Sequence, residues 1–257
     1  MSIQKQAKLP NVLRPRVFEL ARYGRKNDGG YLIPAADLDK SDVLLSFGLN
    51  DDWSFERDAN KHHDLKIYCY DRSVTHKSLL KMLLKNILHF PSIGPFLNTF
   101  YSLITFRIFF SKPNVDFLPY FVGRCISKKS LLFSQVWRQH DIKGCVYLKI
   151  DIEGSEYRIL EDIVLHRENI TGIAIEFHDF DLHVSQITFF VEKMEMHVAH
   201  VHVNNYGEID DEASPNYIEL VLSRSEPASS SYANLPHILD NPNNAREPEV
   251  EITFHDF

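Results

Sequence analysis

The sequence predicts an α/β fold of the Rossmann-like kind. We expect a mostly parallel central sheet with helices on both faces and a C-terminal antiparallel hairpin. Two observations support this. Short apolar runs that end in glycine or acidic residues alternate with helical segments over residues 43–194. Two further apolar runs then follow, separated only by a long loop, which is typical of an antiparallel hairpin.

The individual elements follow from this alternation. We expect one domain spanning residues 1–257, with a helical and aromatic insertion at about 74–112 and an extended tail at about 225–257. The expected strands are 43–47, 65–70, 117–123, 146–150, 172–179, 196–204, 217–223 and 249–254. The expected helices are 12–23, one beginning near 52–54, 77–88, 130–140, 155–167 and 181–194.

Composition excludes several classes of protein. The net charge is −7 and no basic block stands out, so a nucleic-acid-binding role is disfavoured. The chain contains only three cysteines, and their wide spacing matches neither a zinc site nor a disulfide framework: Cys69, Cys125 and Cys145. The first residues lack the apolar core of a signal peptide, and no run is long enough to span a membrane. We therefore expect a cytoplasmic protein.

A ligand-binding turn is predicted after the first strand of the alternation. Gly48 ends the run V-L-L-S-F, and an acid-rich loop leads into a helix. Asp71 ends the next strand, 71 − 48 = 23 positions later, where a carboxylate commonly holds a ribose diol. The alternative for Asp71 is an acid that starts a loop. The pattern G-x-G-x-x-G is absent, which argues against a dinucleotide site.

Acidic residues and a histidine follow two other strands. Asp151 comes directly after 146–150, and Glu176, His178 and Asp179 end 172–179. If these strands are neighbours, Asp151 and His178 face one crevice at the carboxyl edge of the sheet. An acid at a strand end can also be only a helix cap. Together with Glu153, His200 and His202, these side chains include suitable ligands for a divalent ion, although no spaced metal motif is present.

The aromatic stretch 96–110 admits three interpretations. It can pack against the sheet as a helical hairpin, or it can cover an acceptor, including one that carries a lipid. With the nearby basic residues it can also rest on an anionic membrane surface. We expect a lid first, and a peripheral membrane contact is the less favoured alternative.

Several motifs resemble one known family. V-L-L-S-F-G with its acidic loop, Y-C-Y-D, L-K-I-D-I-E-G-S-E-Y-R-I-L and I-E-F-H-D are similar to the FkbM-type family of class I S-adenosylmethionine-dependent methyltransferases. The segment D-x-E-G-x-E is the most specific of these. N-D-G-G-Y-L-I-P, H-V-N-N-Y-G and L-D-N-P-N-N resemble a subgroup found in bacterial polysaccharide loci. The resemblance covers about residues 20–254, without explaining the insertion at 74–112.

The resemblance implies roles for particular residues. Residues Ser46, Phe47, Gly48, Leu49 and Asn50 would approach the methionine part of S-adenosylmethionine, mainly through their backbone. Asp71 would bind the ribose hydroxyls, and Asp151 and His178 would lie beside the acceptor. This chain has G-L-N where class I enzymes often have G-x-G, so the contacts of this loop are the least defined part of the comparison.

The implied reaction is O-methylation of a sugar hydroxyl. Because such a hydroxyl is a poor nucleophile at neutral pH, a general base is expected. His178 has the better intrinsic pKa for this role; Asp151 would orient it or bind the acceptor, with Glu176 as a third candidate catalytic residue. Two alternatives remain open: a metal-assisted methyltransferase of the same fold, and a non-catalytic nucleoside-binding or scaffold protein of a glycan-assembly complex.

Overall fold

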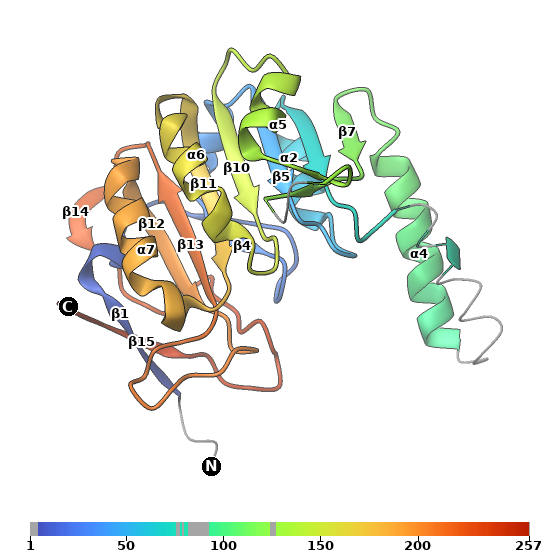
Figure 1. The fold of residues 1–257 in the computed structure, drawn as a ribbon. Coiled ribbons are helices and arrows are strands. Elements are labelled where there is room, and N and C mark those ends of the chain that lie inside the picture. Colours follow the sequence, from blue (N-terminus) through green and yellow to red (C-terminus); the bar gives the residue numbers. More distant parts are fainter. Residues whose placement is uncertain (1–4, 76–77, 79, 82–92, 124–126, 257) are drawn as a thin grey trace.

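A seven-stranded sheet forms the centre of the molecule (Figure 1). The computed structural model describes residues 5–75, 78, 80–81, 93–123 and 127–256. The strand order is β12-β13-β11-β10-β5-β6-β7. Only β13 runs antiparallel to its neighbours in this sheet, and the other pairings are parallel. The bounds are β5 (Val43–Phe47), β6 (Lys66–Tyr70), β7 (Val115–Leu118), β10 (Val146–Ile150), β11 (Ile170–Phe177), β12 (His197–Val203) and β13 (Ile218–Ser223).

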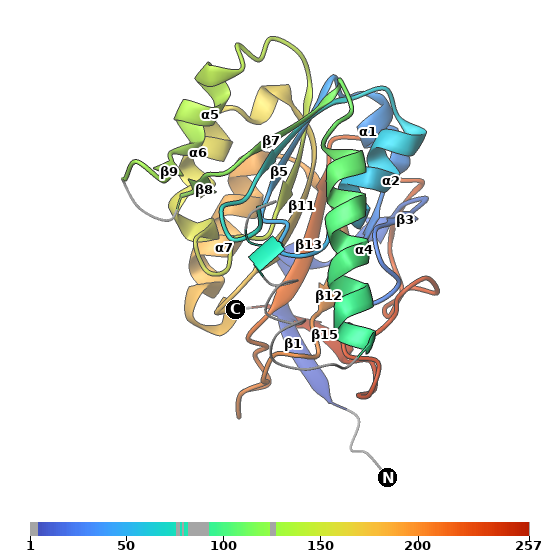
Figure 2. The same cartoon turned by 90° about the vertical axis from the view of Figure 1, so that its right-hand side faces the viewer.

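Helices cover both faces of this sheet, as Figures 1 and 2 show from two sides. One face packs on α1 (Ala35–Asp39), α2 (Ser54–His62) and α4 (Ile93–Phe109), and the other on α5 (Phe133–Gln139), α6 (Leu160–Leu165) and α7 (Phe180–Met194). Successive side chains of a strand point to opposite faces, so Leu148 joins the α5–α7 core and Tyr147 joins the other. The expectation of an α/β fold with a mostly parallel sheet and a terminal antiparallel hairpin is confirmed.

Short strands outside the main sheet pair the N-terminal segment of the chain with the C-terminal segment. β1 (Gln6–Pro10) pairs in parallel with β15 (Glu251–His255), and β2 (Arg16–Val17) pairs with β14 (Ser229–Tyr232). Two further pairs join β3 (Ala21–Tyr23) to β4 (Tyr31–Ile33) and β8 (Phe121–Val122) to β9 (Ser130–Leu131). The 3₁₀ turns are η1 (Asn11–Leu13), η2 (Glu156–Arg158) and η3 (Arg167–Asn169).

A buried polar network fastens the tail to the hairpin. His202 of β12 contacts Glu219 of β13 at 3.2 Å and Glu249 of the tail at 2.8 Å. Asn243, also in the tail, donates to the other oxygen of Glu219 at 2.6 Å. Asn205 donates to tail carbonyl groups, including that of Pro248. The segment after residue 225 is therefore held in place by specific contacts, although it has little regular structure.

Three expected elements differ in the structure. The helix expected at 12–23 is wrong: Pro15 has no N–H to continue a helix, and Arg16–Val17 pairs with β14 instead. The strand expected at 117–123 is two strands, β7 and β8, in separate sheets. The helix expected at 155–167 is divided into η2 and α6. Most of the helix expected at 77–88 lies outside the described residues.

The division of 155–167 has a local cause. Gly154 has φ +86° and turns the chain sharply after β10. The Glu156 carboxylate then reaches back to accept from the backbone N–H groups of Ile152 and Gly154. This side-chain contact satisfies donors of the loop and tightens the first turn into the 3₁₀ form.

Helix α4 lies beyond the β7 edge of the sheet (Figures 1 and 2). Phe106 and Phe109 are buried against the α2 side, where Phe106 meets Trp53. Leu97, Tyr101 and Ile108 are more than half exposed, and Ile104 between them is 42 % exposed. One face of α4 therefore packs on the body of the protein, as the hairpin interpretation requires, whereas the lid that we expected first stays a prediction. Within the described parts of the chain, no helix has the length and apolar character needed to cross a membrane.

Candidate active site

The loops that follow β5, β6, β10 and β11 meet at one edge of the sheet because parallel strands end there together. The N–H of Gly48 donates to the carbonyl of Tyr70, and the N–H of Asp151 donates to the carbonyl of Phe47. Gly48 has φ +80°, and a Cβ atom there would lie 1.5 Å from the carbonyl oxygen of Asp151. Only glycine permits this crossing of the β5 and β10 loops.

Asp71 organises the loop after β5. One carboxylate oxygen accepts from the backbone N–H groups of Leu49 and Asn50, both at 2.8 Å. The other accepts from the backbone and hydroxyl of Ser73. Asp71 is 5 % exposed and lines the adjacent cavity. Asp71 therefore fixes the path of this loop, and its contact with a ribose stays a prediction.

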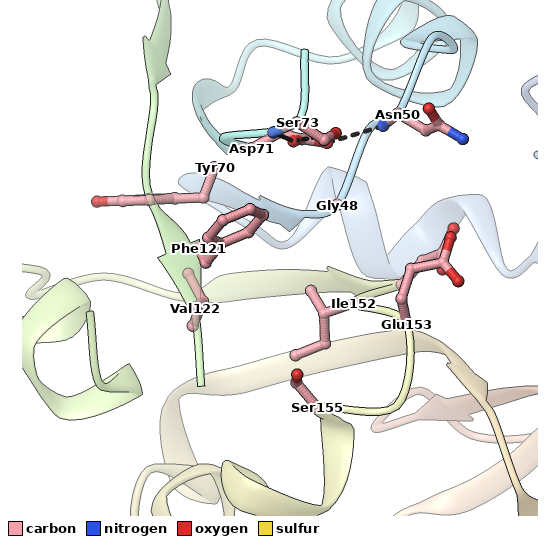
Figure 3. A pocket seen from close by; sticks show the side chains of 11 residues that line it. Gly48, Asn50, Tyr70, Asp71, Ser73, Phe121, Val122, Ile152, Glu153 and Ser155 are labelled. Atoms are coloured by element: carbon pink, nitrogen blue, oxygen red, sulfur yellow. Dashed lines mark hydrogen bonds between the residues drawn. The ribbon is translucent and has the colours of Figure 1, made fainter. Parts of the chain in front are cut away.

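A first cavity of about 280 Å³ lies over the ends of β5, β6 and β10 (Figure 3). Its walls combine apolar groups on one side with backbone and small polar groups on the other. The residues that line it are Gly48, Asn50, Tyr70, Asp71, Ser73, Phe121, Val122, Asp151, Ile152, Glu153 and Ser155. An apolar wall beside a glycine turn suits a planar base joined to a polar sugar.

A second cavity of about 330 Å³ adjoins the first and is more polar. The two share Asn50, Asp151 and Glu153 in their walls. The other residues that line the second cavity are Arg25, Asp28, Gly29, Leu49, Asp51, Asp52, Phe55, Glu56, Lys149, Glu176, His178, Asn204, Tyr206 and Tyr217. The shared residues place the two cavities side by side, with Asp151 in the wall of both.

Lys149 forms a buried cationic floor for the second cavity. It is 5 % exposed, donates to the carbonyl of Gly48 at 2.6 Å and lies 3.7 Å from Asp151. Burial acts to lower the pKa of Lys149, but the charges of Asp151, Glu56 and Glu176 outweigh burial and raise it. Lys149 is therefore charged and holds the acidic groups around it together.

Glu156 bonds the Nδ1 atom of His178. Its Nδ1 lies 3.1 Å from Oε1 of Glu156, which is fully buried, and its Nε2 lies 3.5 Å from Glu153. Burial acts to lower the pKa of His178, but the hydrogen bond and charge of Glu156, with the charges of Glu176 and Asp151, raise it to about 9. His178 is therefore protonated at neutral pH in this arrangement, which weakens the expectation that it serves as the base.

Glu176 is a buried carboxylate in the wall of the second cavity. It is 7 % exposed, and Oε1 accepts from the Asn204 amide at 2.8 Å. Burial raises the pKa of Glu176 well above its ordinary value, and the charges of Asp151 and Glu219 add to this effect. Among the described residues, no hydrogen-bond donor is recorded for its other oxygen. That oxygen is available to a ligand in the cavity.

The structure brings most of the expected site residues together. Asp151, Glu176 and His178 line the second cavity, and Gly48, Asn50 and Asp71 line the first. Three expected cofactor residues lie elsewhere. Leu49 lines the second cavity and not the first. Ser46 is buried and donates to Glu56, and Phe47 packs in the α5–α7 core against Phe133. Neither residue lines a cavity, although Ser46 contacts Glu56, which lines the second one.

Sequence reasoning missed three important residues: Lys149, Glu156 and Asn204. Each had a signal. Lys149 is a charged residue inside an otherwise apolar strand, and Glu156 belongs to the D-x-E-G-x-E motif. Asn204 lies at the end of the strand of alternating histidines and valines. None could be assigned a partner, because the contacts join Asn204 to Glu176 and Glu156 to His178 across different strands.

The mostly parallel sheet with its terminal antiparallel hairpin agrees with the fold that the motif resemblance implies, and the adjoining cavities lie at its carboxyl edge. Residues 104–211 match the family model described as the methyltransferase FkbM domain. The resemblance expected from the motifs is thereby confirmed over these residues, which include Asp151, Glu176 and His178. The loop after β5 and Asp71 lie before the matched region.

No curated protein matches this chain. Solved structures that resemble it include a putative tRNA (m1A22) methyltransferase of Streptococcus pneumoniae in complex with S-adenosyl-L-methionine, at 12 % identity and a TM-score of 0.38 over 77 % of this chain and 72 % of that one. Another is the precorrin-6y C5,15-methyltransferase of Geobacter metallireducens, at 12 % identity and a TM-score of 0.37 over 74 % and 86 %. These scores are low, and the assignment of the fold rests on the strand order.

Proposed function

We propose that this protein is an S-adenosylmethionine-dependent O-methyltransferase that acts on a sugar hydroxyl in bacterial polysaccharide or glycan biosynthesis. The observation that carries the proposal is the junction of the two cavities at Asp151. A methyl donor in the first cavity and an acceptor in the second would meet there. The polar lining of the second cavity suits an acceptor with several hydroxyl groups.

The cofactor would lie across the ends of β5 and β6. Its adenine would rest on the apolar wall formed by Phe121 and Val122, and its methionine part would follow the backbone of residues 48–50. The Asp71 carboxylate, which already fixes Leu49 and Asn50, would face the ribose. Ser46 and Phe47 would contribute through the position of the strand end alone.

Methyl transfer in this site is a single displacement. A lone pair of the acceptor oxygen forms the new C–O bond, and the C–S bond breaks with its electrons going to sulfur, which leaves S-adenosylhomocysteine. The hydroxyl proton would go to the free oxygen of Glu176. Asp151, at the junction, would orient the hydroxyl toward the methyl group, and His178 would hold a second acceptor oxygen. Alignment of these atoms can supply several kcal/mol of rate enhancement.

Two measurements test the proposal in order. Calorimetric titration with S-adenosylmethionine and S-adenosylhomocysteine should show saturable binding to the purified protein. Radiolabelled methyl transfer should then be measured with mono- and oligosaccharide acceptors. Absence of cofactor binding in a folded protein would overturn the proposal. Binding without transfer to any glycan would instead favour a non-catalytic nucleoside-binding or scaffold role.

We also propose that the exposed face of α4 rests on an anionic membrane surface, where lipid-linked acceptors would be met. Leu97, Tyr101, Ile104 and Ile108 recur every three to four residues and form one exposed stripe. No acidic residue occurs between Asp71 and Asp116, although the whole chain has a net charge of −7. A basic and apolar segment within an acidic protein complements anionic lipid headgroups.

Co-sedimentation with vesicles tests this contact. Vesicles rich in phosphatidylglycerol should retain the protein, and vesicles of phosphatidylcholine should not. Tyr101→Ser with Ile108→Ser should abolish retention. Leu182→Ser, which changes an exposed apolar residue on α7, should leave it unchanged. Equal retention of the wild type, the double variant and Leu182→Ser would contradict the proposal. So would sedimentation velocity that shows self-association through this stripe when the vesicles retain no protein.

A further inference from the structure

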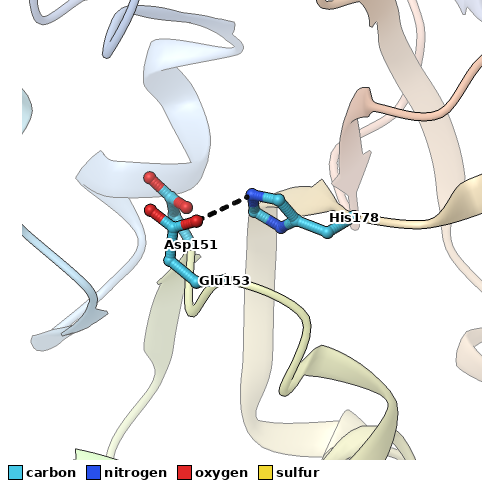
Figure 4. A group of neighbouring side chains, drawn as sticks. All are labelled: Asp151, Glu153 and His178. Atoms are coloured by element: carbon cyan, nitrogen blue, oxygen red, sulfur yellow. Dashed lines mark ion pairs between the residues drawn. The ribbon is translucent and has the colours of Figure 1, made fainter. Parts of the chain in front are cut away.

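Three ligand-type atoms converge at the edge of the second cavity. Asp151 and Glu153 follow β10, and His178 follows β11 (Figure 4). Each of these residues offers one oxygen or nitrogen atom, and the three atoms lie within 4.8 Å of one another. Glu153 has φ +55°, a left-handed conformation that is unfavourable for glutamate. The backbone of this loop is thus held in a specific form that places Glu153 opposite His178.

The orientation of His178 is fixed from the far side of its ring. Oε1 of the fully buried Glu156 accepts from the N–H groups of Ile152 and Gly154 and lies 3.1 Å from Nδ1 of His178. The Nε2 atom is thereby directed at Glu153. A carboxylate that holds one ring nitrogen while the other faces open ligand positions is the usual support of a metal-binding histidine.

A second observation is independent of this trio. Glu176 is 7 % exposed, lines the same cavity and has one oxygen with no recorded donor in the described parts of the chain. This oxygen is open to the cavity, whereas the Asn204 amide occupies the other one. A cation-bound water or hydroxyl group in the cavity can donate to it.

The charge of the cavity also fits a cation. Seven acidic side chains line it, compared with Arg25, Lys149 and His178 as basic groups. Lys149 is the nearest basic side chain to Asp151, but its hydrogen bond goes to the carbonyl of Gly48 at 2.6 Å, whereas Asp151 is 3.7 Å away. The Lys149 ammonium group is therefore bonded to Gly48 and is not shared with Glu153 and His178.

We propose that Asp151, Glu153 and His178 bind a divalent cation that accepts mixed oxygen and nitrogen ligands, with Mn²⁺ as the representative ion. The cation displaces the proton from Nε2 of His178, because a histidine ligand must be deprotonated at the bound nitrogen. Three protein ligands leave coordination positions open toward the cavity. As an extension that rests on the proposed function, two neighbouring hydroxyl oxygens of the acceptor occupy these positions. The cation then orients the diol and increases the acidity of the hydroxyl that faces the methyl group.

Metal binding is tested with Mn²⁺ alone, by electron paramagnetic resonance and calorimetry on the full chain. The wild-type protein should bind one Mn²⁺. Asp151→Asn and His178→Gln should each weaken binding at least tenfold, and Glu156→Gln should weaken it by about 10- to 100-fold through loss of the ring support. Glu161→Gln, at an exposed position on α6, is the matched control and should bind as the wild type does.

Circular dichroism and thermal melting of each variant establish that the comparison is between folded proteins. The absence of saturable Mn²⁺ binding by the wild type, or equal affinity in Asp151→Asn, His178→Gln and the control, would overturn the site. Cofactor binding is measured in parallel. Full methyl transfer after removal of all metal would contradict the role of the cation in orienting the acceptor and leave the proposed function standing. Mn²⁺ binding without cofactor binding would support the site and contradict the proposed function.

Discussion

The carboxylate of Asp71 accepts the backbone N–H of Asn50 at 2.8 Å, across the gap between the ends of β6 and β5. The same oxygen accepts from Leu49, so one side chain sets the path of the loop that the cofactor would follow. Asp71 therefore stabilises the loop after β5, in addition to the ribose contact that its sequence position predicts.

Asp71→Ala should therefore weaken both stability and S-adenosylmethionine binding. The backbone donors of Leu49 and Asn50 would lose their acceptor, at a cost of about 1–3 kcal/mol of the free energy of unfolding. Urea denaturation and calorimetric titration measure the two effects. A variant with unchanged stability and lost binding would show that the carboxylate acts on the ribose alone.

Gly48→Ala should disrupt the site more severely. The left-handed φ of +80° costs roughly 1–2 kcal/mol for a residue with a Cβ atom. The new methyl group would also overlap the carbonyl of Asp151. We expect a lower unfolding midpoint and loss of cofactor binding, because the β5 and β10 loops must separate. Normal binding by this variant would contradict the proposed path of the cofactor.

Lys149→Met should reduce stability by roughly 3–5 kcal/mol, since it leaves buried carboxylates without their cation. Adding Glu56→Gln should restore part of this loss because Glu56 is one of those carboxylates. A double-mutant cycle in chemical denaturation measures the coupling. Strictly additive effects would show that Lys149 acts on its other neighbours only.

Glu176→Gln should slow methyl transfer by about 10²–10⁴-fold if its free oxygen accepts the hydroxyl proton. The amide keeps an oxygen for Asn204, so the fold and cofactor affinity should persist. Single-turnover rates and calorimetry separate these effects. Turnover close to that of the wild type would remove Glu176 from the chemistry and return attention to His178 and Asp151.

The tail network predicts a stability that falls at high pH. His202 is buried between Glu219 and Glu249, with His200 and Asp240 nearby on the same side. Burial acts to lower the pKa of His202, but its bonds to both glutamates raise it to about 10, compared with an ordinary value of 6.5. The raised pKa stabilises the fold fully below pH 6.5, and this stabilisation is lost as the pH rises toward 10.

The corresponding variant is His202→Gln. At pH 7 it should unfold more easily by roughly 3–5 kcal/mol, because the two glutamates lose their buried partner. The difference from the wild type should shrink between pH 7 and pH 10. Denaturation curves across this range provide the test, and a difference that stays constant with pH would show that His202 is uncharged in the folded protein.

The sequence by itself determined the fold class and the edge of the sheet that carries the site. Apolar runs such as 43–47 and 146–150 become buried strands in any compact arrangement, and glycine and acidic residues end them. Asp71, Asp151 and His178 could therefore be placed at strand ends from local pattern alone. The same reasoning failed at 12–23, where pairing with β14 outweighed local helical character, although the nearest register pair, Val17 and Ser229, is 229 − 17 = 212 positions apart.

Only the tertiary structure decided how these residues act. Glu156 bonds His178 from another loop, Asn204 bonds Glu176 across the hairpin, and Lys149 serves carboxylates from three separate segments. These contacts depend on the lateral order of strands, which places β13 between β11 and β12 and β10 beside β5. Local propensity acts along the chain and carries no information on that order. The order of strands in the sheet decides which groups surround each side chain. Those neighbours set its pKa, and therefore its charge and its chemistry.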